Sequence, residues 1–212
     1  MAMQPAPYPV QFSVDYPDRS LDRLTTAFRI FVAIPILILL GAVNGGSFSV
    51  YTHEGLRYVT WGAGGLLFVG PLLMILFRRK YPRWWFDWNL ELQRFVNRVL
   101  IYVLLMDDRY PATDQQQAVH LEWPLPATNG GLNRWLPLVK WFLAIPHFIV
   151  LAFLWIAVVV VVFIAWIAII FTGRYPRSIF DFVEGVIRWG ARVVAYSLTL
   201  VTDRYPPFSL AP

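Results

Sequence analysis

Long apolar runs separated by short polar segments dominate the pattern of this chain. One run covers residues 27–43, a second covers about 59–77, and a third covers 139–171. A bilayer core about 30 Å thick requires about 20 consecutive apolar residues in a helix. Runs of this kind therefore predict transmembrane segments, and the polar stretch 47–58 predicts a loop between the first two.

The third run permits two interpretations. Residues 141–171 contain no charged side chain, and a single helix of this length would measure about 46 Å at 1.5 Å per residue. The run is either one long, tilted helix or a hairpin of two short helices. Two hairpins would leave Arg57 as the only one of 18 basic residues on the far side, which agrees with the positive-inside rule. We therefore expect four spans, with both termini cytoplasmic.

Two segments that follow apolar runs have charged residues at helical spacing. Residues 84–105 and 178–200 each contain one charged stripe on an otherwise apolar, aromatic-rich helix. Such segments are typical of amphipathic helices lying in the membrane interface. The stripes begin at Asp87 and Asp181, which we expect to pair with Arg83 and Arg177, four residues earlier. We interpret the rest as solvated faces with local ion pairs: Glu91, Arg94 and Arg98 in the first, and Glu184, Arg188 and Arg192 in the second.

Two short stretches alternate apolar and polar residues. Residues 10–16 and 119–123 both show the two-residue period of a half-buried strand, and each precedes an apolar run. They predict a few short cytoplasmic β-strands. Ser20 is a candidate N-cap for the helix that follows the first strand.

The chain is a duplication. Lys80-Tyr81-Pro82-Arg83-Trp84-Trp85-Phe86-Asp87 returns as Arg174-Tyr175-Pro176-Arg177-Ser178-Ile179-Phe180-Asp181, and each copy is followed by an Asp-Arg-Tyr-Pro ending at 108–111 or 203–206. Pro35 and Pro146 are also equivalent, so the repeats are 1–111 and 112–212. Within the motif we expect a structural role for eight residues: Tyr81, Pro82, Phe86, Asp87, Tyr175, Pro176, Phe180 and Asp181.

The paired motifs and paired endings resemble a bacterial membrane-protein family known only as a domain of unknown function. The resemblance extends over almost the whole chain, in two copies. It implies a location in the bacterial inner (cytoplasmic) membrane. It implies no activity, cofactor or catalytic residue.

Composition supports a membrane protein. Hydrophobic residues make up 58% of the chain and charged residues 15%, against about 25% charged residues in soluble domains. The absence of cysteine excludes disulfides and thiolate chemistry. The net charge is +5, but the basic residues flank apolar runs. Anionic lipid head groups explain this placement better than nucleic acid does.

Basic clusters beside the apolar runs are the candidate lipid head-group contacts, because guanidinium groups pair with phosphate. They are Arg78, Arg79, Lys80, Arg83, Arg174 and Arg177. Lys140 lies at a helix entrance, where it can extend to the interface, and His147 is a weaker candidate proton carrier. The sequence shows no metal-ligand spacing, phosphate loop or acidic residue within a predicted span, so we expect neither metal nor cofactor.

The fold class expected is mainly α and integral to the membrane, with two units that each contain a short transmembrane hairpin and an interfacial helix. The function expected is non-enzymatic: an accessory or scaffold subunit that binds lipids, partner membrane proteins or both. The alternative is a transporter or lipid scramblase built on the internal repeat. An enzyme acting on lipid head groups would require Asp87, Asp181 or His120 to converge in one pocket.

Overall fold

The chain folds mainly into helices. The computed structural model describes residues 8–44, 46–52, 55–61, 72–78, 81–113, 115, 117–126, 132–133 and 135–212. Their elements are, in chain order, β1 (Gln11–Val14), α1 (Arg23–Ala27), α2 (Arg29–Asn44), β2 (Gly46–Thr52), β3 (Gly55–Trp61), the π-helix η1 (Met74–Arg78), α4 (Arg83–Val103), β4 (Val119–Glu122), α5 (Leu136–Thr172) and α6 (Arg177–Ser197).

The third apolar run forms one continuous helix, so the hairpin predicted for the second half is wrong. Helix α5 has 37 residues and is about 55 Å long at 1.5 Å per residue. Pro146 lies inside it, and the helix ends only at Gly173, whose φ of 73° closes the last turn. After Pro146 the run contains no glycine or proline to begin a turn.

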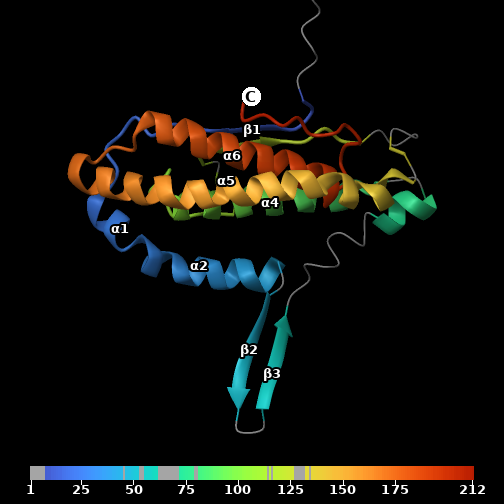
Figure 1. Ribbon diagram of the computed structural model, residues 1–212, viewed down its shortest axis with the longest axis horizontal. Helices are drawn as coiled ribbons and strands as arrows, with labels where there is room; N and C mark the ends of the chain where they lie inside the picture. Colours follow the sequence, from blue (N-terminus) through green and yellow to red (C-terminus); the bar gives the residue numbers. More distant parts are fainter. Residues whose placement is uncertain are drawn as a thin grey trace, which may run out of the picture.

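The first half differs from its prediction in another way. Strands β2 and β3, which cover most of the predicted loop, form an antiparallel hairpin in which Gly46 pairs with Trp61. The helical span predicted from about residue 59 is therefore wrong over residues 59–61, which belong to β3. Residues 62–71 of that span lie outside the described residues. In Figure 1 this hairpin projects beyond α2, away from β1. Within the described part of the chain, α5 is the one helix long and apolar enough to cross a bilayer.

Helices α5 and α6 pack side by side, and in Figure 1 α4 lies behind α5 in the view, with β1 beyond α6 and α2 on the opposite side. A narrow stripe of α5 faces α6: Ala144, Leu151, Val158 and Ala165 recur every seven residues and are buried. This spacing keeps one seam of α5 against its neighbour. Helix α2 packs on α4 through Ala33 and Ile36, against Val99 and Tyr102.

The two alternating stretches form strands that pair with each other. β1 and β4 are antiparallel, with Phe12 opposite Leu121. Each strand packs on the helix of the other half, β1 on α6 and β4 on α4. Their inward residues, such as Phe12, Val14 and Leu121, are buried. The two repeats therefore interlock, because neither half covers its own amphipathic helix with its own strand.

The C-terminal segment also lies against α6, and Gly185 permits this contact. A Cβ atom at Gly185 would lie 2.9 Å from Leu210 Cβ and 3.0 Å from the Leu210 carbonyl oxygen. At Gly190, on the same helix, a Cβ atom would meet nothing within 4 Å. These two glycines provide a matched pair of sites.

We predict that Gly185→Ala lowers the stability of the fold by about 1–3 kcal/mol, because the added methyl group overpacks the contact with Leu210. Gly190→Ala should instead raise stability by about 0.5–1 kcal/mol, the usual gain for alanine in a helix. Thermal unfolding of both purified variants in mild detergent measures the difference. Equal midpoints for the two variants would contradict the close packing of the C-terminal segment on α6.

Candidate functional site: buried cations and an apolar face

The first repeat is closed by a polar network at the start of α2. Asp22 is the N-cap of α1, and its Oδ1 accepts a hydrogen bond from the Leu24 amide at 2.8 Å. The predicted N-cap, Ser20, is therefore wrong by two residues. The Asp22 amide in turn donates to the Asp108 carboxylate at 3.3 Å, which joins the beginning of this half to its Asp-Arg-Tyr-Pro ending.

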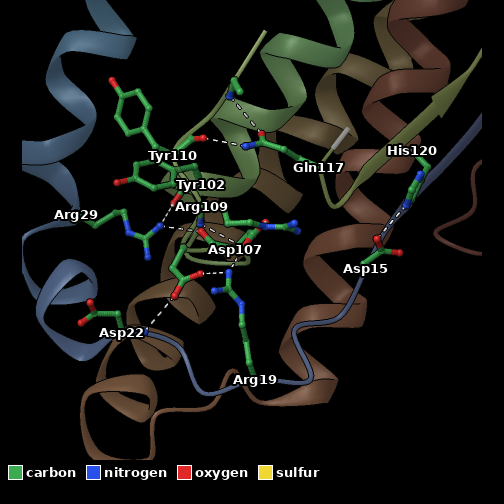
Figure 2. A network of polar contacts seen from close by, with 12 residues as sticks. Asp15, Arg19, Asp22, Arg29, Tyr102, Asp107, Arg109, Tyr110, Gln117 and His120 are labelled. Atoms are coloured by element: carbon green, nitrogen blue, oxygen red, sulfur yellow. Dashed lines mark hydrogen bonds and ion pairs between the residues drawn. The ribbon is translucent and has the colours of Figure 1, made fainter. Parts of the chain in front are cut away.

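Arg29 is the central side chain of this network and is only 2% exposed. Its Nη1 donates to the Asp107 carbonyl oxygen at 2.7 Å, and its guanidinium carbon lies 4.2 Å from the centre of the Tyr102 ring. Figure 2 shows Arg29 directed at the Asp107 segment. Its Nε and Nη2 atoms have no hydrogen-bond partner among the described residues.

Two other arginines form ion pairs with the carboxylates of Asp107 and Asp108. Arg19 pairs with Asp107 at 3.1 Å and also pairs with Asp108, while Arg109 Nε lies 2.9 Å from Asp107 Oδ2. In Figure 2, Arg19 extends to this cluster from below, whereas Arg29 lies at its left. Arg29 therefore bonds to a backbone carbonyl, and in the described part of the chain it makes no direct ion pair.

The second repeat contains an equivalent network. Lys140 is fully buried, and its Nζ donates to the Thr202 carbonyl oxygen at 2.7 Å. Lys140 Nζ also lies 2.7 Å from Asp203 Oδ1 and 5.0 Å from the centre of the Tyr196 ring. The Asn133 amide donates to the Asp203 carboxylate at 2.6 Å, as the Asp22 amide does to Asp108. The interpretation of Lys140 as a side chain extending to the interface is wrong.

The two networks also have the same aromatic pairs and backbone turns. Tyr102 and Tyr110 stack edge-to-face at 5.6 Å, and Tyr196 and Tyr205 do so at 5.7 Å. Leu105 and Leu200 both have a positive φ, at 66° and 58°, a conformation unusual for leucine. Each Asp-Arg-Tyr-Pro ending is thus part of a polar network around one buried cation. We refer to the network of Arg29, Tyr102, Asp107 and Asp108 as the Arg29 lock, and to that of Lys140, Tyr196, Thr202 and Asp203 as the Lys140 lock.

The interpretation of the charged stripes as solvated faces is wrong for three of their arginines. Arg98, Arg188 and Arg192 are buried, and they donate to backbone carbonyls. Arg188 Nε bonds to Phe12 of β1 at 2.9 Å, and Arg192 Nη1 bonds to Ala211 at 3.0 Å. Burial, together with the nearby Arg188, lowers the pKa of Arg192. Local ion pairs do form beside them, at Glu91–Arg94 and Glu184–Arg188.

The opening motif forms the joint before each amphipathic helix. Pro82 and Pro176 are the N-cap residues of α4 and α6. Tyr81 packs edge-to-face on Phe86, and Tyr175 does so on Phe180. Burial raises the pKa of the Tyr81 hydroxyl, which is consistent with its role as a donor to the Thr199 carbonyl at 2.8 Å.

The two aspartates of the motif behave differently. Asp181 pairs with Arg177 at 3.0 Å on the surface. Asp87 is also exposed, but no ion pair joins it to Arg83 in the described part of the chain. The expected Arg83–Asp87 pair is therefore wrong, and the Arg177–Asp181 pair is present.

The candidate lipid head-group residues do not form one cluster. Arg78, Arg83, Arg174 and Arg177 are exposed, while Arg79 and Lys80 lie outside the described residues. Helices α4 and α6 begin at opposite ends of the molecule in Figure 1, so Arg83 and Arg177 are far apart. Their placement leaves head-group contact an untested prediction.

The residues proposed for an enzyme do not converge. Asp87 and Asp181 lie just after the first turns of α4 and α6, which begin at opposite ends of the molecule in Figure 1, and His120 pairs with Asp15 at 3.0 Å beside the small sheet. His147 is buried and accepts a hydrogen bond from Trp189 Nε1 at 3.1 Å. It stacks on Phe208 at 3.9 Å. Among the described residues no group of three potential ligands is placed to hold a metal ion.

Helices α2 and α5 expose an apolar face that sequence patterning indicates only in part. In the most apolar 18-residue window of α5, 17% of the residues are buried. Helix α2 also exposes large hydrophobic side chains on the side away from α4. We define the apolar face by these exposed residues: Ile30, Phe31, Ile34 and Ile38 of α2, and Phe142, Ile149, Phe153, Ile156, Val160, Phe163 and Ile167 of α5.

Two grooves lie beside α5 at equivalent positions of the repeats. The first, of about 330 Å³, is lined by Thr26, Ile30, Val103, Val159 and Trp166 among others, and Arg29 is the one charged residue among its described lining residues. The second, of about 460 Å³, is lined by Leu72, Pro137, Trp141, Ile145 and Phe148 among others, and none of the described residues that line it is charged. The Arg29 lock therefore adjoins a groove with a polar end, and the described lining of the second groove is apolar.

Comparison with known proteins identifies one family. Residues 135–209 match a family described as Domain of unknown function (DUF4389). The matched segment contains α5, α6 and the Asp203 ending, which is most of the second repeat. No curated protein and no solved structure matches the chain.

We predict that Asp203→Asn lowers stability by about 3–5 kcal/mol, because it leaves the buried Lys140 ammonium without a carboxylate. Asp181→Asn removes an exposed pair and should cost no more than about 1 kcal/mol. Chemical denaturation in mild detergent, monitored by far-UV circular dichroism, measures both. A loss at Asp203 as small as that at Asp181 would contradict a structural role for the Lys140 lock.

Proposed function

We propose that this protein is a non-enzymatic membrane module that binds the lipid bilayer through its apolar face and serves as an accessory or scaffold subunit. The resemblance in the paired motifs favours the bacterial cytoplasmic membrane as its location. Partner membrane proteins would meet the module within or beside the same membrane.

The observation that carries the proposal is the exposed circumference of α5. Its most apolar window is largely uncovered, with Phe153 and Val160 more than half exposed. Contiguous apolar surface beyond a few hundred Å² is rare on soluble monomers and marks membrane or protein contacts. Helix α2 adds a second strip of the same character. Insertion of both strips into lipid would remove this surface from water.

The packing of α6 on α5 favours an orientation in the membrane plane. Helix α6 runs back along α5 and contacts β1 on another side. If α5 crossed the bilayer, α6 and β1 would enter the hydrocarbon beside it. Gln11 and Ser13 of β1 and Asp15, which follows it, are exposed, and lipid-exposed strand edges and charges are unfavourable there. With α5 in the plane, the sheet stays in water.

This orientation replaces the four-span topology in our proposal. A hairpin within α5 is excluded by its continuity, and α2, with 16 residues, would measure about 24 Å, less than the bilayer core. Tyr8, where the described part of the chain begins, and the C-terminal segment would lie on the aqueous side with the β1–β4 sheet. No described residue supplies a polar pathway between the repeats, so no observation favours transport or scrambling over the scaffold function.

We predict that the purified protein floats with neutral phosphatidylcholine vesicles in a density gradient, because apolar burial rather than charge holds it. The double variant Phe153→Asp/Val160→Asp should reduce the bound fraction at least tenfold, since a carboxylate within hydrocarbon costs about 2.5–3.5 kcal/mol. Ser13→Asp, on the exposed side of β1, is the matched control and should float like the unmodified chain. Unchanged flotation of the double variant would overturn the proposed membrane contact.

A further inference from the structure

The groove beside Arg29 combines a buried cation with an open apolar channel. Its lining comes from α1, the start of α2, the end of α4 and the outer side of α5. Val159 and Phe163 of α5 are exposed, and Phe163 belongs to the apolar face, so the groove opens toward the proposed membrane. Trp166 Nε1 donates to the Thr26 carbonyl at 3.2 Å, which fixes one wall.

Arg29 retains unused hydrogen-bonding capacity at the polar end. Its Nη1 is occupied by the Asp107 carbonyl, whereas Nε and Nη2 have no partner among the described residues. These two nitrogens form one edge of the guanidinium group, which matches the two oxygens of a carboxylate or phosphate. A buried donor without a partner costs free energy, so an oxyanion at this edge would be stabilising.

The surrounding carboxylates do not fill this position. Asp107 and Asp108 are held by Arg19 and Arg109, and Asp22 caps α1 with its side chain. In the Lys140 lock the situation is reversed, because Asp203 pairs directly with the cation. Lys140 also does not line the second groove. The two repeats therefore differ in whether the buried cation already has a carboxylate partner: Lys140 pairs with Asp203, and Arg29 makes no ion pair among the described residues.

We propose that the groove beside Arg29 binds one anionic membrane lipid, with its oxyanion on Arg29 Nε and Nη2 and its acyl chain along Val159, Val162 and Phe163. The inference rests on the proposed membrane contact, and it adds a specific ligand class and a specific site. The shared chemistry is an oxyanion, a carboxylate or a phosphodiester, attached to acyl chains in a lipid without a cationic group, as in oleate and phosphatidylglycerol but not in phosphatidylcholine. The second groove, whose described lining is apolar, should not select for charge.

Arg29→Lys tests the head-group contact while keeping the fold. The equivalent position of the second repeat is already a lysine, which reaches its carbonyl at 2.7 Å. A lysine at 29 should thus retain the bond to Asp107 and lose the two-nitrogen edge. Val159→Trp fills the groove, and Ile145→Trp does the same in the second groove as the matched control.

Native mass spectrometry of the detergent-solubilised full chain measures lipid capture, with oleate, phosphatidylglycerol and phosphatidylcholine offered separately. We expect one oleate or one phosphatidylglycerol to bind at least tenfold more tightly than phosphatidylcholine, and the comparison of the two anions identifies the preferred head group. Arg29→Lys and Val159→Trp should each weaken capture of the anionic lipid at least tenfold. Ile145→Trp should change it less than twofold.

Several results would overturn the lipid site while leaving the proposed function intact. They are equal capture of phosphatidylcholine, undiminished capture by Arg29→Lys or Val159→Trp, or a mass shift that corresponds to a second copy of the chain instead of a lipid. Flotation on neutral vesicles is a separate readout, because Arg29→Lys should float like the unmodified protein. Loss of flotation by the unmodified chain would instead refute the membrane contact itself.

Discussion

One buried cation holds each repeat closed, Arg29 in the first and Lys140 in the second, and the rest of the structure depends on them. Arg29 and Lys140 stand at the starts of α2 and α5, and each donates to the backbone at the end of its own repeat. A buried charge is tolerated only when it is bonded or paired. Each cation therefore fixes where its apolar helix begins relative to the returning amphipathic helix, and this alignment places α5 along α6.

The position of the small sheet follows from the same requirement, that buried charges be bonded or paired. Arg94 and Arg188 bond to the carbonyls of opposite residues in β4 and β1, Leu121 and Phe12. The arginines of α4 and α6 thus hold the small sheet and the C-terminal segment over the helices. With that side covered, α2 and the outer side of α5 are the surfaces left for contact with lipid. The separation of polar and apolar sides is the physical basis of the proposed orientation.

Sequence patterning predicted the mainly helical fold and its short strands because these depend on local periodicity. The alternation at 10–16 and 119–123 was sufficient to indicate β1 and β4, and the Tyr-Pro pairs mark the starts of α4 and α6. Burial of Arg29, Lys140, Arg98 and Arg192 was not predictable, since it depends on carbonyls contributed from distant segments. The equivalence of Arg29 with Lys140 was visible in the sequence, but its meaning required the positions of Asp107 and Thr202. A hairpin within α5 was inferred from the distribution of basic residues along the chain. The structure has one continuous helix instead, because no glycine or proline interrupts the run after Pro146.

The depth of α5 in the membrane is the most direct test of this account. The chain has no cysteine, so single cysteines at Phe142, Ile149, Phe153, Val160 and Ile167 can be spin-labelled without background. Electron paramagnetic resonance in vesicles, with oxygen and a water-soluble nickel complex as opposing relaxants, gives the depth of each label. We predict a uniform, shallow depth of about 5–10 Å along the whole helix. A profile that deepens to a maximum near the middle of α5 and rises again at both ends would contradict the account and show that the helix crosses the bilayer.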